Sequence, residues 1–251
     1  MTSPRAASHA DTPTPSRLGV LASGGGSNVQ ALIDHFADAA IVGRMVWVGS
    51  DRADAGALDR AAAAGIGTAV INAPQDGEAL LAQLRLAGVE LLVLAGYLKL
   101  VPEIVVQAYR GRLLNVHPAL LPAFGGAGMY GHRLHTAVLA HGALITGATV
   151  HFVDEAFDRG PIVAQWPVPV LPGDSATMLA ARVLRVEHQL LPLCVAAVAS
   201  GAIVLGEDNR VHGHLDVAVP STAPEWRFTL TSDAASEPLG LATDLVHLFP
   251  R

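Results

Sequence analysis

Two polar side chains stand at the end of one apolar run and could act together in catalysis. Asn115 and His117 lie two residues apart in the segment Leu113–Pro118, so on a strand their side chains point to the same side. An amide donates neutral hydrogen bonds, and an imidazole changes its charge near neutral pH. Together they could hold a developing oxyanion. The residues alone leave open the alternative that His117 simply packs beside Pro118.

An acidic loop further along the chain offers a partner for this histidine. Asp154, Glu155 and Asp158 lie in the segment His151–Pro161. A carboxylate beside His117 would set the protonation state of its ring. A solvated acidic turn is the alternative, and it is the common fate of such loops.

A glycine-rich turn near the N-terminus is a candidate anion site. Ser23–Asn28 joins the apolar run Leu18–Ala22 to a segment whose apolar residues have helical spacing. Backbone amides in such a turn, together with a helix N-terminus, attract a phosphate group. Because Gly24, Gly25 and Gly26 are consecutive, the turn matches neither a dinucleotide fingerprint nor a P-loop. It therefore predicts phosphate binding without indicating ATP or NAD, and an ordinary tight turn is the alternative.

Alternating strands and helices must position these residues. The expected strands are Leu18–Ala22, Met45–Val48, Thr68–Ile71, Val89–Ala95 and Arg112–Val116, and the helices between them include Ala53–Ala64, Gln75–Ala87 and Val101–Tyr109. This alternation predicts an α/β fold with a Rossmann-like, mostly parallel sheet and helices on both faces. In the C-terminal half, Gly147–Val153 and Ile162–Val170 predict antiparallel edge strands, followed by a long helix over Ala176–Ser200.

Composition excludes several classes of protein. The 251 residues carry 16 Lys and Arg against 22 Asp and Glu, a net charge of −6, which argues against a nucleic-acid partner. Cys194 is the single cysteine, so no internal disulfide is possible and a reducing cytoplasm is expected. No apolar run reaches the roughly 18–20 residues of a membrane span. The spacing of His132, His135 and His141 does not predict a metal site, and we expect surface or packing roles for them.

The chain divides into three parts by composition. Residues 1–16 are rich in Ser, Thr, Pro and Ala and predict a disordered leader. Residues 17–206 form the expected catalytic domain. Residues 207–251 are expected to be a C-terminal extension to which no role can be assigned.

Four segments together resemble the formyltransferases that use 10-formyltetrahydrofolate. They are Ser23–Asn28, Leu94–Tyr97, Leu114–Pro122 and Val150–Pro161, and the resemblance covers Arg17–Val204. The glycine loop is similar to that of the branch acting on glycinamide ribonucleotide. The resemblance implies the formyltransferase fold and transfer of a formyl group from 10-formyltetrahydrofolate to the amine of glycinamide ribonucleotide, in de novo purine biosynthesis. It implies a folate co-substrate and no metal.

The resemblance also implies roles for individual residues. Asn115 and His117 would stabilise the tetrahedral oxyanion, while Asp158 would support His117 and help to move protons. The implied binding residues are Gly26, Ser27 and Asn28 for the substrate phosphate, Glu187 for the ribose, and Leu98, Lys99, Leu100, Val101, Val153 and Asp154 for the folate. Thr149 and His151 match positions near the site.

The loop after the catalytic motif and the charge of the substrates add two expectations. The glycine-rich segment Phe124–His132 would lie over the substrate. Both substrates are anionic and the chain is acidic, so local groups must bind them. The loop amides are the first candidates for this role, with Arg112 or Arg133 as possible additions.

Other functions fit part of the pattern. Methionyl-tRNA formyltransferase carries a further C-terminal domain, whereas residues 207–251 are few and not basic. Formyltetrahydrofolate deformylase carries an N-terminal regulatory domain, whereas only Met1–Ser16 precedes the first expected strand. A sugar-nucleotide formyltransferase and a catalytically silent sugar-phosphate-binding module are further alternatives. The expected partners are small molecules, with neither nucleic acid nor membrane, and the chain is expected to be a monomer or homodimer.

Overall fold

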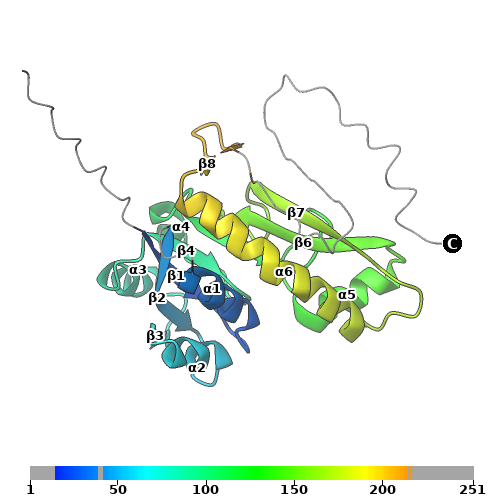
Figure 1. Cartoon of the computed structure of the whole chain (residues 1–251), viewed down its shortest axis with the longest axis horizontal. Helices are drawn as coiled ribbons and strands as arrows, with labels where there is room; N and C mark the ends of the chain where they lie inside the picture. The colour runs from blue at the N-terminus through cyan, green and yellow to red at the C-terminus, as the bar shows by residue number, and fades with distance from the viewer. Residues whose placement is uncertain (1–14, 39–41, 214, 216–251) are drawn as a thin grey trace, which may run out of the picture.

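A computed structural model describes residues 15–38, 42–213 and 215, and the leader and most of the C-terminal extension lie outside them. The described residues form a seven-stranded sheet of order β3-β2-β1-β4-β5-β6-β7 and a separate pair, β8 and β9 (Figure 1). The predicted α/β fold with a mostly parallel sheet is therefore confirmed.

Strands and helices alternate through the first half of the chain. The strands of the large sheet are β1 (Ser16–Leu21), β2 (Gly43–Ser50), β3 (Gly67–Val70), β4 (Leu91–Leu94), β5 (Leu113–His117), β6 (Ile145–Phe152) and β7 (Ile162–Pro169). The helices are α1 (Ser27–Asp38), α2 (Gly56–Ala63), α3 (Gly77–Leu86), α4 (Glu103–Ala108), α5 (Gly131–Ala140) and α6 (Ala176–Ala199).

The strand order creates a point at which ligands can bind. Strands β1 to β5 pair in parallel, while β5 with β6 and β6 with β7 pair antiparallel. From β1 the chain first moves outward through β2 to β3, and then returns to place β4 on the other side of β1. At such a switch point the loops after neighbouring strands diverge and leave a crevice at the carboxyl ends.

Alternate side chains along the strands pack into two separate hydrophobic cores. Leu18 and Val20 of β1 are buried in a cluster that includes side chains of α1, α2, α5 and α6. Leu21 belongs instead to a second cluster that includes side chains of α3 and α4. Helices therefore cover both faces of the sheet, as the continuous apolar runs predict. Figure 1 shows the long helix α6 across one face, where it contacts α1, α5, β6 and β7.

Helix α5 corrects one expectation from the sequence. The segment Phe124–His132 was expected to be a glycine-rich loop, but α5 begins at Gly131 and includes His132. The start of this helix could not be recognised in the sequence, because glycines are typical of turns. Gly128 and Gly131 both have positive φ angles, 83° and 55°. The helix is held by Leu134 and Val138, which are fully buried.

Two further expectations concern the C-terminal half. The long helix α6 is capped by Ser175, whose hydroxyl accepts a hydrogen bond from the Met178 amide at 3.2 Å. Strands β8 (Ile203–Leu205) and β9 (Val211–Gly213) pair with each other across the predicted boundary at residue 206. Where the domain ends thus remains a prediction.

Within the described parts of the chain, no helix combines the length and apolarity needed to cross a membrane.

The buried histidine of α5 gives a prediction about stability. His135 is 3% exposed, and burial, followed by the charges of His132 and His117, lowers its pKa from 6.5 to about 4. As pH falls, the unfolded chain therefore binds this proton first, and stability is lost between about pH 6.5 and pH 4. We expect His135→Gln to flatten the fall of Tm over this range.

Thermal melts at several pH values check this expectation. His141→Gln is the matched control, because it changes the same residue type at an exposed position, the C-cap of the same helix. If the Tm of His135→Gln falls as steeply with pH as that of the wild type, the lowered pKa of His135 is not the cause of the loss of stability.

Candidate active site

One cavity lies at the carboxyl ends of the neighbouring strands β4 and β5, beside the loop that follows β1. The glycine loop follows β1, residues 95–101 follow β4, and Asn115 and His117 lie on β5 itself. The cavity has a volume of about 700 Å³, which suits a ligand of cofactor size. Of the residues expected to act in the reaction, those that line it are Leu98, Lys99, Leu100, Val101, Asn115, His117, Val153, Asp154, Asp158 and Glu187.

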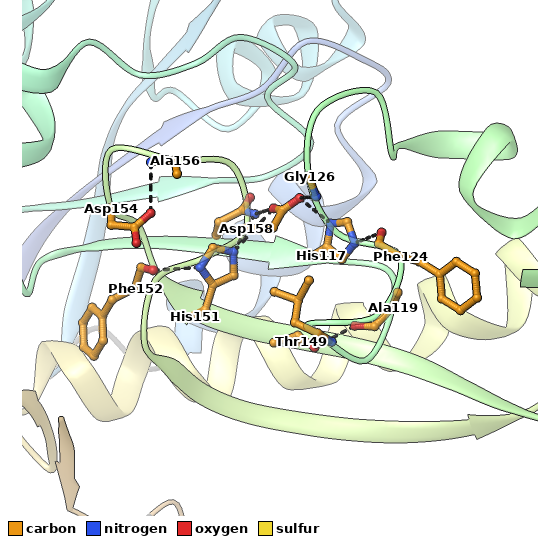
Figure 2. Close-up of polar contacts among 12 residues, drawn as sticks. His117, Ala119, Phe124, Gly126, Thr149, His151, Phe152, Asp154, Ala156 and Asp158 are labelled. Atoms are coloured by element: carbon orange, nitrogen blue, oxygen red, sulfur yellow. Dashed lines mark hydrogen bonds and ion pairs between the residues drawn. The ribbon is translucent and has the colours of Figure 1, made fainter. Parts of the chain in front are cut away.

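Asp158 connects the polar groups at the floor of this cavity. One carboxylate oxygen lies 3.5 Å from Nδ1 of His117 and accepts the Gly126 amide at 2.9 Å. The other accepts a hydrogen bond from the Asn115 amide at 3.3 Å and lies 3.7 Å from Nε2 of His151. Figure 2 shows Asp158 between the two imidazole rings. Asp158 thus contacts both of the other expected catalytic residues.

The surroundings of Asp158 keep it ionised. Burial by itself raises the pKa of the carboxyl, but the imidazoles of His151 and His117 and the Gly126 amide outweigh it and hold that pKa below its usual range. The backbone of Asp158 adopts a φ of 57°, a left-handed conformation that Asp tolerates better than most residues. The loop therefore bends at this residue to bring the carboxylate inward.

His117 is enclosed and has an acceptor on each side. Its side chain is 5% exposed, with Nε2 2.9 Å from the carbonyl oxygen of Phe124 and Nδ1 facing Asp158. Burial lowers the pKa of His117, while the Asp158 carboxylate and the Phe124 carbonyl oppose this shift. The ring is therefore neutral near neutral pH, and a proton on it would be stabilised by an acceptor at each nitrogen.

His151 fixes the orientation of the Asn115 side chain. Nδ1 of His151 lies 2.7 Å from the Phe152 carbonyl oxygen, which can only accept, so Nδ1 carries the hydrogen. Nε2 is then an acceptor for the Asn115 amide at 3.0 Å. Since the Asp158 carboxylate also only accepts, both contacts require the amide nitrogen of Asn115 to face inward.

Buried hydrogen bonds hold the turn that follows His117. The hydroxyl of Thr149 donates to the Ala119 carbonyl at 2.6 Å and accepts the Leu121 amide at 3.1 Å. The Gln165 amide donates to the Leu121 carbonyl at 2.9 Å. Thr149 is fully buried, so it positions the turn and does not contact a ligand.

The glycine loop lies beside the main cavity. Gly26, Ser27 and Asn28 are not among the residues that line it, and Ser27 lines a neighbouring hollow together with Arg60. The link between the two is Glu187 of α6, which lines the cavity and accepts a hydrogen bond from the Asn28 side chain at 2.7 Å. Burial raises the pKa of the Glu187 carboxyl, and the Asn28 hydrogen bond opposes that shift.

The cationic residues near the site differ from those expected. Neither Arg112 nor Arg133 lines the cavity. The Arg112 guanidinium is held at the opposite end of β5, where it donates to the Glu90 carbonyl at 3.1 Å. Arg60 was not expected, yet its Nε donates to the Gly25 carbonyl at 2.8 Å. Its distance in the sequence from the glycine loop left no local signal for this contact.

Comparison of the chain with known proteins shows the family to which it belongs. The profile described as formyl transferase matches residues 16–195. The chain belongs to the formyl transferase family. A chloroplastic phosphoribosylglycinamide formyltransferase of Arabidopsis thaliana is 42% identical over 204 residues, which cover 78% of this chain and 70% of the relative.

Solved structures of the family agree with this fold. Phosphoribosylglycinamide formyltransferase from Anaplasma phagocytophilum aligns with a TM-score of 0.72 at 36% identity, covering 79% of this chain and 94% of that one. A formyltetrahydrofolate deformylase from Pseudomonas syringae aligns with a TM-score of 0.69 at 22% identity, covering 80% and 66%. That second likeness concerns the fold alone. The resemblance found in the sequence motifs is confirmed.

The glycine loop gives a prediction with a matched control. Gly26 has a φ of +73°, and a Cβ there would lie 2.5 Å from the Ala57 Cα. We expect Gly26→Ala to lower the free energy of unfolding by at least about 2 kcal/mol, because a strained φ and a backbone clash combine. Gly24 has no described atom within 4 Å of such a Cβ, so Gly24→Ala is expected to be nearly neutral.

Urea unfolding of both variants measures the difference. Equal losses of stability in the two variants would contradict the packing of Gly26 against α2.

Proposed function

We propose that this chain transfers the formyl group of 10-formyltetrahydrofolate to the amine of glycinamide ribonucleotide. The single observation that carries the proposal is the buried Asp158 carboxylate in contact with both Asn115 and His117 inside the cavity. The relatives named phosphoribosylglycinamide formyltransferase support the choice of reaction. The proposal assigns one chemical task to each polar side chain.

Formyl transfer to an amine requires two kinds of assistance. The amine nitrogen attacks the formyl carbon and forms a C–N bond, which makes the carbonyl oxygen an oxyanion. Collapse of this tetrahedral intermediate breaks the bond to N10 of the folate, which must gain a proton, while the attacking nitrogen loses one. The site must therefore stabilise negative charge and move a proton.

Asn115 supplies the hydrogen bond to the oxyanion. Both of its amide hydrogens have acceptors in the absence of substrate, but the contact with Asp158 at 3.3 Å is longer than that with His151 at 3.0 Å. A developing oxyanion competes for the first of these hydrogens, because its bond to Asp158 is the longer and weaker of the two. His151 keeps the amide in place throughout the reaction.

His117 takes part in the proton transfer. In its neutral form Nε2–H donates to the Phe124 carbonyl and Nδ1 is free to accept a proton. A proton arriving at Nδ1, through water from the amine, forms an ion pair with Asp158. The same proton then returns to N10 of the folate as it leaves.

The two substrates occupy neighbouring parts of the site. The folate lies along Leu98–Val101 and against Val153 and Asp154, which line the cavity. The phosphate of the ribonucleotide binds the amides of Gly26–Asn28 at the N-terminus of α1. Arg60 adds positive charge beside that loop, and Glu187 accepts hydrogen bonds from the ribose.

The remaining features of the proposal concern the setting of the reaction. The co-substrate is 10-formyltetrahydrofolate, with no metal, and the chain acts as a monomer or homodimer in the cytoplasm. The single cysteine, Cys194, is buried in α6, which fits a reducing compartment. The Arabidopsis relative is named as chloroplastic, so relatives also work in other compartments.

A formyl-transfer assay tests the function. The purified chain is given 10-formyltetrahydrofolate with and without glycinamide ribonucleotide, and tetrahydrofolate release is measured. Release that requires the ribonucleotide supports the transferase. Release without any amine indicates the deformylase alternative, while binding of a sugar phosphate with no release indicates the silent module.

Substitution of the polar groups tests the mechanism. We expect Asp158→Asn and His117→Ala each to reduce kcat by about 100-fold or more, because proton transfer loses its acceptor or its stabilising charge. Asp59→Asn, the same substitution at an exposed position of α2, is the control and should keep full activity. Circular dichroism confirms that the variants fold. Rates like those of the wild type in both variants would refute the assigned roles.

A further inference from the structure

A buried serine joins the glycine loop to residues 97–101, which form one wall of the cavity. Ser23 follows β1 and is 2% exposed. Its hydroxyl donates to a carboxylate oxygen of Asp51 at 2.6 Å and accepts the backbone amide of Leu98 at 3.0 Å. The backbone amide of Ser23 also donates to the Gly96 carbonyl at 3.1 Å. Both polar functions of the hydroxyl are therefore occupied by groups of two different strand ends.

Asp51 makes a second contact with the same wall. Its side chain is 7% exposed, and its other carboxylate oxygen lies 3.9 Å from Nζ of Lys99. Asp51 directly follows β2, whereas Leu98 and Lys99 come after β4. Since Lys99 is 54% exposed, this ion pair is weak in water. The buried contacts of Ser23 therefore supply most of the attachment.

The two ends of this segment are anchored by the buried side chains of Tyr97 and Val101, but its middle, Leu98–Leu100, has little other support. Residues 97–101 lie outside every helix and strand of the described chain, so their amides have no regular hydrogen-bonding ladder. Two apolar side chains of this wall, Leu98 and Leu100, are 43% and 49% exposed and contribute little packing. Without the hydroxyl of Ser23, the Leu98 amide would lose its acceptor and the backbone would shift.

We propose that Ser23 is a positioning residue for the folate: its hydroxyl, held by Asp51, fixes the backbone of Leu98–Val101 against which the folate binds. This inference rests on the proposed function, since it assumes that the folate occupies this wall. Ser23 does not touch the substrate. Its backbone bond to Gly96 is independent of the hydroxyl, so loss of the hydroxyl leaves the glycine loop in place.

Equilibrium binding of tetrahydrofolate, measured by isothermal titration calorimetry, is the primary test. We expect Ser23→Ala to weaken the Kd by about ten-fold, the effect of one lost buried hydrogen bond. Asp51→Ala should weaken it by a similar factor, and the double variant should be no weaker than either single one, because both remove the same brace.

The matched control is Ser16→Ala at the other end of β1. Its hydroxyl donates to the Ala199 carbonyl at 3.1 Å, so it also loses one hydrogen bond, and it should bind tetrahydrofolate as the wild type does. In the transfer assay, Ser23→Ala should raise the KM for 10-formyltetrahydrofolate by the same ten-fold. We expect its kcat and its KM for the ribonucleotide to stay within about two-fold.

The outcomes separate this inference from the proposed function. Failure of the wild type to transfer formyl groups, with tetrahydrofolate still bound and Ser23→Ala weaker, refutes the function and keeps the inference. An unchanged Kd in Ser23→Ala overturns the inference, as does a wild type that binds no tetrahydrofolate. A lower kcat together with an equal rise in both KM values and a lower Tm also overturns it, because this pattern indicates a purely structural role.

Discussion

The organisation of the site depends on one buried carboxylate. Asp158 is 10% exposed in its side chain, and a charge in that position is stable only where donors or cations surround it. The Asn115 side chain of β5 and the Gly126 amide of the loop that follows donate hydrogen bonds to it, and His117 of β5 becomes its cationic neighbour when Nδ1 takes up a proton. By satisfying its own charge, the carboxylate joins a strand and two loops into one arrangement.

The sheet explains why these groups can meet. The order of the strands reverses beside β1, so the ends of β1 and β4 diverge and leave room for ligands. β5 adds the proposed catalytic side chains, Asn115 and His117, next to that opening, and its antiparallel neighbour β6 carries His151 directly opposite Asn115. The sheet thus supplies the floor of the cavity, and the loops supply the walls to which the proposed substrates would bind.

The sequence predicted those parts of the site that leave a signal in residue type and spacing. Asn115 and His117 alternate on a strand, so their common orientation follows from geometry. Asp158 could not be separated from a solvated acidic turn by pattern, and only the resemblance to the family selected it. The Phe124 carbonyl and the Gly126 amide could not be predicted, because backbone groups act regardless of side-chain type. Arg60 likewise reaches the glycine loop through tertiary packing alone.

Hydrogen exchange of the Gly126 amide is the most direct test of the central claim that Asp158 organises the site. This amide donates to the carboxylate at 2.9 Å, so we expect Asp158→Ala to accelerate its exchange by about ten-fold or more. The nearby Ala123 amide, which donates to the Leu120 carbonyl at 3.0 Å, should exchange at an unchanged rate. If the Gly126 amide exchanges at the same rate in the wild type and in Asp158→Ala, the result contradicts the claim that Asp158 organises the site.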